Sequence, residues 1–118
     1  MLSYKKVKKE KSMKKPNDVI ELLQSIKNRP GMFIGKRSVL RLKCFMDGYL
    51  CAMQFEGIDI KPDVYYSFIR WLSEKYQIRS VVSYDTILTD ALHDDELAFD
   101  AFFEEFEMFL QSVIINKL

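Results

Sequence analysis

The sequence predicts an all-α protein, a single compact bundle of about five helices. Four segments place large apolar residues at helical spacing, and one short run, Ile78–Tyr84, alternates loosely as a strand would. The chain has 118 residues, of which 48% are hydrophobic and 30% charged, as is usual for one globular domain. Nine Phe, six Tyr and one Trp supply the bulk of a core. We therefore expect at least about 55% helix and at most one minor strand pair.

Capping residues and glycines delimit the first two long helices. Either Asn17 or Asp18 can cap a helix that runs to about Asn28. Ser38 suits the start of the next helix. That helix ends near Gly57, where a left-handed residue favours termination.

Three more helices are predicted in the second half of the chain. Residues 62–76 begin with a proline that suits a first helical turn. The run 78–84 has no obvious pairing partner, so we interpret it as a loop that leads into a short helix over 83–92. Asp94 or Asp95 then caps the last and longest helix. The apolar face of this helix contains Phe99, Phe102, Phe103, Phe106 and Phe109.

The segment Arg29-Pro-Gly-Met-Phe-Ile-Gly35 separates the first two helices. Pro30 disfavours helix at Arg29, while Gly31 and Gly35 permit backbone conformations that other residues avoid. We interpret these four residues as a structural motif rather than as a ligand loop. The segment is similar to a short motif of type II topoisomerase ATPase domains, but the metal-binding Glu/Asn helix and the Asp-x-Gly-x-Gly loop of those domains do not follow it. We expect no ATP binding.

The N-terminus differs in composition from the rest. Seven lysines and one acid, Glu10, occur in the first 15 residues. Because so few apolar residues could join a core, we predict a flexible lysine-rich arm over 1–16 and one helical domain over 17–118. The arm lacks the apolar segment of a secretory signal, and no run approaches the ~18 apolar residues of a membrane span. We expect a cytoplasmic location and no membrane partner.

Few residues suit metal binding or covalent catalysis. With one histidine, His93, and two cysteines, a Cys/His zinc site is nearly excluded. His93 has no Ser or Cys in an elbow motif to activate, so we expect a capping or surface role. Cys44 and Cys51 lie roughly 10 Å apart along one predicted helix, too far for a disulfide, and we expect two reduced, partly buried thiols. We predict no enzymatic activity, no cofactor and no metal.

The net charge of +1 hides a strong asymmetry. No Lys or Arg occurs from Ser80 to Asn116, where nine acids occur. At about 100° per residue, Asp100, Glu104 and Glu107 fall within about 80° of Glu96, opposite the phenylalanines. No lysine at i+4 compensates them, which indicates a basic partner rather than a solvated face. The predicted partner-binding residues are Asp90, Asp94, Asp95, Glu96, Asp100 and Glu104.

A longer pattern covers about residues 18–110. It combines the motif at 29–35, Asp47-Gly-Tyr49, the aromatic run Phe68-Ile-Arg-Trp-Leu72 and the acidic, Phe-rich last helix. The pattern resembles small bacterial immunity-type proteins of polymorphic-toxin and contact-dependent inhibition loci. The resemblance implies a non-enzymatic protein that binds and neutralises a cognate toxin, a basic nuclease effector, whose phosphate ligand the acidic face would mimic. Candidate anchors within that face are Trp71, Tyr84 and Phe99.

Two other functions stay open. A small nucleic-acid-associated regulator would use the lysine arm together with Lys36–Lys43. A structural adaptor would dock a basic helix on the acidic face. The arm has no interleaved aromatic residue beyond Tyr4, so we expect it to be a solubilising tail or a ligand of the chain's own acidic face. The expected partner is therefore a protein rather than a nucleic acid.

Overall fold

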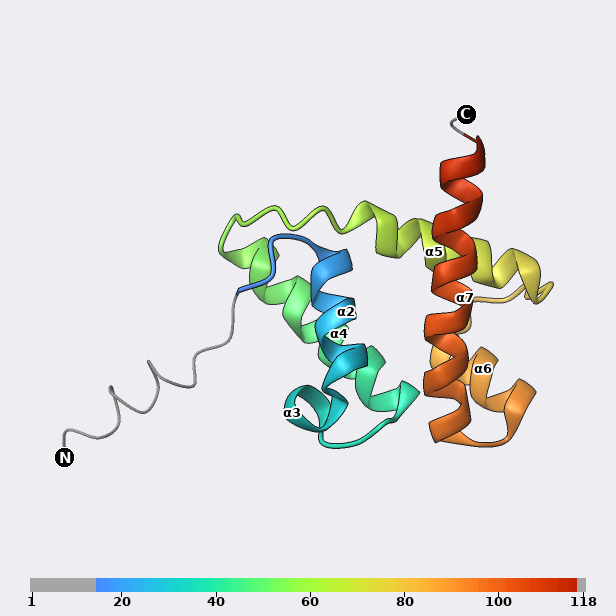
Figure 1. The fold of residues 1–118 in the computed structure, drawn as a ribbon. Coiled ribbons are helices and arrows are strands. Elements are labelled where there is room, and N and C mark those ends of the chain that lie inside the picture. Colours follow the sequence, from blue (N-terminus) through green and yellow to red (C-terminus); the bar gives the residue numbers. More distant parts are fainter. Residues whose placement is uncertain (1–14, 117–118) are drawn as a thin grey trace.

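The computed structural model describes residues 15–116, of which 75% are helical and none lies in a strand. Figure 1 shows the order of the helices along the chain. They are α2 (Val19–Asn28), α3 (Pro30–Ile34), α4 (Val39–Phe55), α5 (Asp63–Lys75), α6 (Tyr84–Leu92) and α7 (Asp95–Asn116). The all-α prediction is confirmed, but residues 15–116 contain six helices rather than five, because Pro30–Ile34 forms a short helix inside the predicted connection. The predicted arm lies outside the described residues, apart from Lys15 and Pro16.

Short polar side chains begin three of the helices. A side-chain oxygen of Asp18, Ser38 and Asp94 accepts a hydrogen bond from the backbone N–H three residues later, at 2.9, 3.1 and 2.8 Å respectively. Each bond satisfies a donor that the first helical turn leaves unpaired. Of the predicted alternatives, Asp18 rather than Asn17 and Asp94 rather than Asp95 are the caps.

Residues with a positive φ follow four of the described helices, at Gly35, Gly57, Gln77 and His93. Gly57, with a φ of +66°, lies just beyond α4, as predicted. His93, with a φ of +56°, ends α6, and its N–H donates to the carbonyl of Thr89 at 2.6 Å. His93 is exposed. The sole histidine of the chain therefore caps a helix at the surface, as expected.

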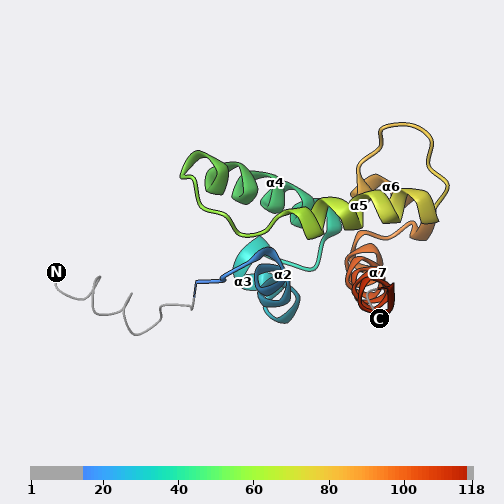
Figure 2. The same cartoon turned by 90° about the horizontal axis from the view of Figure 1, so that it is seen from above.

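A cluster of aromatic rings lies in the core where α5 crosses α7 (Figures 1 and 2). Phe68 of α5 lies among three phenylalanines of α7, with ring centroids 5.2 Å from Phe102, 5.0 Å from Phe106 and 5.7 Å from Phe109. All four rings are buried. Aromatic contacts at this distance add to the free energy gained by burying apolar surface. The contacts fix which side of α7 faces inward.

A buried hydrogen bond joins α5 to the start of α6. The hydroxyl groups of Tyr65 and Tyr84 lie 2.7 Å apart, and the two residues are 1% and 2% exposed. Burial raises the pKa of both phenols well above the ordinary value, because the charged phenolate loses its hydration.

The sequence motif at 29–35 is a structural connection with a built-in helical turn. Gly35 ends α3 with a φ of +88°, and Arg41 Nη1 donates to the Ile34 carbonyl at 3.0 Å. The positive φ favours glycine there, and a Cβ atom at Gly35 would lie 2.5 Å from Arg41 Nη1 and displace that guanidinium group. A Cβ atom at Gly31 would meet nothing within 4 Å.

The tyrosine pair predicts a loss of stability in alkali. Unfolded tyrosines ionise near pH 10, whereas the folded pair stays protonated above that pH. Their contribution is therefore complete below pH ~10 and is lost as the pH rises further, by up to ~1.4 kcal/mol per pH unit for each phenol. Urea unfolding between pH 8 and 11 should show a shallower decline for the Tyr65→Phe/Tyr84→Phe variant than for the parent. The exposed control Tyr66→Phe should follow the parent, and equal slopes for all three proteins would refute the assignment.

The positive φ of the glycine at the end of α3 predicts that a substitution there lowers the stability of the protein. Gly35→Val should lower the free energy of unfolding by ~1 kcal/mol or more, because valine disfavours a positive φ and collides with Arg41. Gly31→Ala, the control, should leave stability unchanged or raise it by up to ~1 kcal/mol, since alanine favours helix. Thermal unfolding measures both, and a Gly35→Val variant as stable as the parent would contradict the structural role.

Candidate functional site

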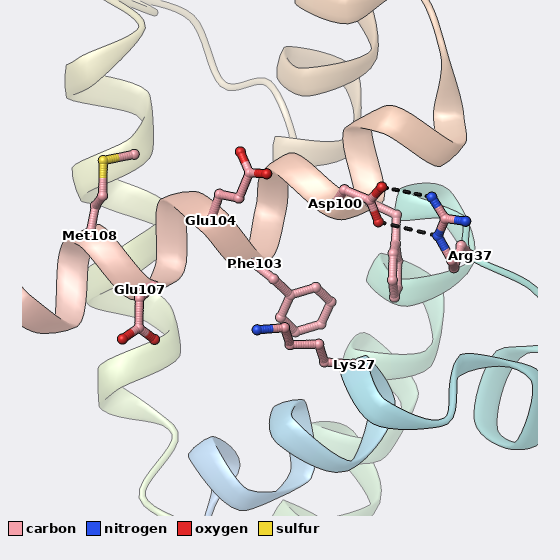
Figure 3. A pocket seen from close by; sticks show the side chains of 8 residues that line it. Lys27, Arg37, Asp100, Phe103, Glu104, Glu107 and Met108 are labelled. Carbon is pink, nitrogen blue, oxygen red and sulfur yellow. Dashed lines mark hydrogen bonds and ion pairs between the residues drawn. The ribbon is translucent and has the colours of Figure 1, made fainter.

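A groove of about 690 Å³ runs along α7 and is closed on its other side by residues from α2 and from the α3–α4 connection (Figure 3). We call it the α7 groove. Its lining residues are Lys27, Arg37, Phe99, Asp100, Phe103, Glu104, Glu107 and Met108.

The floor of the α7 groove is apolar. Phe99 and Phe103 contact each other edge to face, with ring centroids 5.0 Å apart, and are 3% and 7% exposed. Met108 stands farther along α7 and is 44% exposed. The groove thus offers the edges of two fixed rings and one adaptable thioether to a ligand.

One arginine ties the start of α4 to the acidic side of α7. Arg37 Nε and Nη2 donate to the two carboxylate oxygens of Asp100, at 3.2 and 2.6 Å, and Arg37 Nη1 lies 2.5 Å from Glu96 Oε1. The hydrogen bonds to Asp100 are the main reason that the pKa of Arg37 is raised. The prediction that these acids are uncompensated is wrong for Glu96 and Asp100. Their cation is not on α7 at all but lies 63 residues from Asp100 in the sequence.

The six predicted partner-binding residues do not form one surface. Glu96, Asp100 and Glu104 lie on the side of α7 that carries the groove and Arg37. Asp90 and Asp95 line a separate hollow of about 380 Å³.

Two of these residues also have structural roles. Asp94 caps α7, with its Oδ1 2.8 Å from the N–H of Leu97. Asp95 Oδ1 accepts a hydrogen bond from the N–H of Leu40, at 3.2 Å, and so ties α7 to the first turn of α4. The acidic face of the sequence prediction is therefore part groove, part second hollow and part helix cap.

Five groove residues were neither predicted partner contacts nor candidate anchors, namely Lys27, Arg37, Phe103, Glu107 and Met108. Glu107 and Lys27 were missed for different reasons. Glu107 belongs to the acidic stripe, and its position three residues after Glu104 was a usable signal. Lys27 could not be found in this way, because it reaches the groove only through the packing of α2.

The structure places the three candidate aromatic anchors in different surroundings. Tyr84 is buried, is bonded to Tyr65 and does not line the α7 groove, so its prediction as an anchor there is wrong. Trp71 is half-buried in the α5–α7 packing, with Lys75 Nζ 5.2 Å from its ring centroid. Phe99 alone lines the groove.

Glu105 shows that the acids of α7 do not all face outward. It is 6% exposed, and Lys75 Nζ donates to its Oε1 at 2.7 Å. Its other oxygen has no hydrogen-bond partner among the described residues. Glu105 does not line the groove and serves the packing of α7 on α5.

Within residues 15–116, no group of three or more His, Cys, Asp or Glu side chains is placed to hold a metal ion. Cys44 and Cys51 are free thiols and both are exposed, so the expectation that they are partly buried is wrong. The same residues contain no helix with the length and apolarity needed to cross a membrane. Comparison with protein-family models, with curated proteins and with solved structures found no match.

Proposed function

We propose that this protein is a non-enzymatic inhibitor of the immunity type, which binds and neutralises a cognate bacterial toxin through the α7 groove. The observation that carries the proposal is an acidic rim above an apolar floor. Glu104 and Glu107 are exposed, and neither forms an ion pair with a described residue. Phe99, Phe103 and Met108 lie beside them.

The charge of the α7 groove favours a basic partner. Arg37 supplies one positive charge to two carboxylates, Glu96 and Asp100, so that cluster keeps a net negative charge. Glu104 and Glu107 add two more negative charges against the single cation of Lys27. A toxin that cleaves nucleic acid needs cations around its active site. An excess of carboxylates would speed encounter with such a surface and occupy its phosphate subsites.

The apolar floor of the α7 groove favours binding of a protein partner rather than of mobile counterions. Interfaces gain most of their affinity from a few desolvated anchors surrounded by polar contacts. Met108, exposed and flexible, can adapt to an inserted side chain, while the rings of Phe99 and Phe103 are held in place by core packing. The site would act in the cytoplasm, where such a toxin meets its substrate.

The basic segment Lys36–Lys43 gives little support to the nucleic-acid alternative. Arg37 is paired with α7, Arg41 bonds to the Ile34 carbonyl, and Lys43 Nζ lies 2.7 Å from Asp47. Three cations of that segment thus bond to other groups of the chain, which makes them less available to bind phosphate. The adaptor alternative would use the same groove for a basic helix, so only a neutralisation assay separates it from an inhibitor.

The test neutralises Glu104 and Glu107, the two acids of the α7 groove that form no ion pair within residues 15–116. Changes at Glu96 or Asp100 are unsuitable because they would release Arg37. Glu104→Gln with Glu107→Gln should leave the melting temperature unchanged, slow association with the cognate toxin, identified as a protein that co-purifies with this chain, about tenfold at low salt, and flatten its salt dependence. Protection of cells that express that toxin should fall in parallel. Glu56→Gln with Glu74→Gln, which removes the same charge from exposed sites elsewhere, should behave as the parent.

Equal binding and protection by the groove variant and the parent, at low and high salt, would show that the groove is not the contact surface. Salt-sensitive binding of the intact chain to DNA or RNA would favour the regulator instead. Binding of the co-purifying protein without any loss of its toxicity would favour the adaptor.

A further inference from the structure

The two sides of the α7 groove carry opposite charge. On the α7 side, the exposed carboxylates of Glu104 and Glu107 form no ion pair with a described residue. On the α2 side, Lys27 is exposed, and within residues 15–116 it has no carboxylate at ion-pair distance either. Arg37, the other cation that lines the groove, is paired with α7. Lys27 is therefore the lining cation that a partner can bind.

The packing of α2 and α7 keeps these opposite charges on separate sides. Four buried residues anchor α2, each no more than 1% exposed, namely Val19, Leu22, Leu23 and Ile26. Ile26 directly precedes Lys27 in the last turn of that helix. Figure 3 shows the Lys27 side chain beside the ring of Phe103, which belongs to the apolar floor. The floor thus lies between one cation and two carboxylates.

A partner that covers the α7 groove removes water from all three charged groups. A charge that loses its water without gaining a group of opposite sign costs free energy and so lowers affinity. A uniformly basic surface would satisfy Glu104 and Glu107 but would place positive charge against Lys27. Such a like-charge contact weakens binding and rejects the partner that makes it. The groove is therefore complementary to a surface that carries both signs of charge.

We infer that the α7 groove recognises a toxin surface on which an apolar side chain lies between a cation and a carboxylate. The apolar side chain packs on Phe99 and Phe103, and the cation lies against Glu104 and Glu107. The carboxylate binds Lys27. This inference rests on the proposed function and specifies the chemistry of the partner. A surface turned by half a rotation would bring like charges together, so Lys27 determines both the orientation and the specificity of binding.

The effect of Lys27→Gln on binding has opposite signs for the two kinds of partner surface. If a carboxylate binds Lys27, the variant should bind the toxin that co-purifies with this chain about tenfold more weakly, mainly through faster dissociation. Against a uniformly basic surface, the same variant would make the groove more acidic, speed association and tighten binding. Surface plasmon resonance at low and high salt measures both rates. Unchanged or tighter binding of Lys27→Gln would overturn the inference.

Two control variants separate the position of this charge from the net charge of the chain. Lys27→Arg keeps a cation at the same place and should keep most of the affinity. Lys36→Gln removes the same charge from an exposed residue that does not line the groove, and it should bind as the parent does. Melting temperatures check that α2 stays folded in each variant. An equal loss of affinity in Lys36→Gln would show that net charge alone is responsible, and would also overturn the inference.

Cross-linking of the complex identifies the carboxylate. A carbodiimide joins an amine to a carboxylate in contact with it as an amide, so it should link Lys27 to an aspartate or glutamate of the toxin. Lys27→Glu should weaken binding, and replacement of that toxin residue by lysine should restore it, as a double-mutant cycle requires of a direct pair. Loss of affinity without any restoration would contradict the pairing.

Failure of this inference can be distinguished from failure of the proposed function. Unchanged binding by the variant Glu104→Gln with Glu107→Gln refutes the groove as the contact surface. Weaker binding by that variant together with tighter binding by Lys27→Gln refutes only the carboxylate opposite Lys27.

Discussion

The packing of three α7 phenylalanines around Phe68 is the interaction on which the rest of the structure depends. It fixes the rotation of the longest helix in the protein. A helix whose one face is committed to the core must place its remaining residues on the opposite side. Glu104 and Glu107 are therefore held at the surface by apolar contacts in which they take no part. The acidic rim of the α7 groove follows from how the phenylalanines pack.

Arg37 links the start of α4 to α7 at one end of the α7 groove. It stands between Ser38, which caps α4, and the turn at Gly35, so its backbone is fixed on both sides. From there its guanidinium group reaches two carboxylates on α7. The pairs are exposed and of modest energetic value. Their main effect is geometric, because they hold Asp100 in a defined position at one end of the groove.

Local chemistry explains why the helix boundaries could be predicted from the sequence. Asp18 and Ser38 cap helices through their own side chains, and Gly57 ends one through its own backbone conformation. The helix α3 was missed because five residues are too few for periodicity to show.

The site could be predicted only in part, because two of its eight lining residues, Lys27 and Arg37, reach it only through tertiary packing. The acidic spacing on α7 located Asp100 and Glu104, but spacing on one helix carries no information about Lys27 or Arg37 on other elements. The number of acids on α7 overestimates its exposed negative charge, because Glu105 is buried and paired with Lys75. Its position beside Phe106, on the apolar side of the helix, was the available signal.

The central claim is that the α7 groove contacts the partner, and carboxylate footprinting tests it most directly. The free chain and its complex with the toxin that co-purifies with it are labelled with a carbodiimide and an amine, and the labelled carboxylates are located by mass spectrometry. Labelling of Glu104 and Glu107 should slow several-fold in the complex, while labelling of the exposed Glu56 and Glu74 should not change. Unchanged labelling of Glu104 and Glu107 in a saturated complex would contradict it.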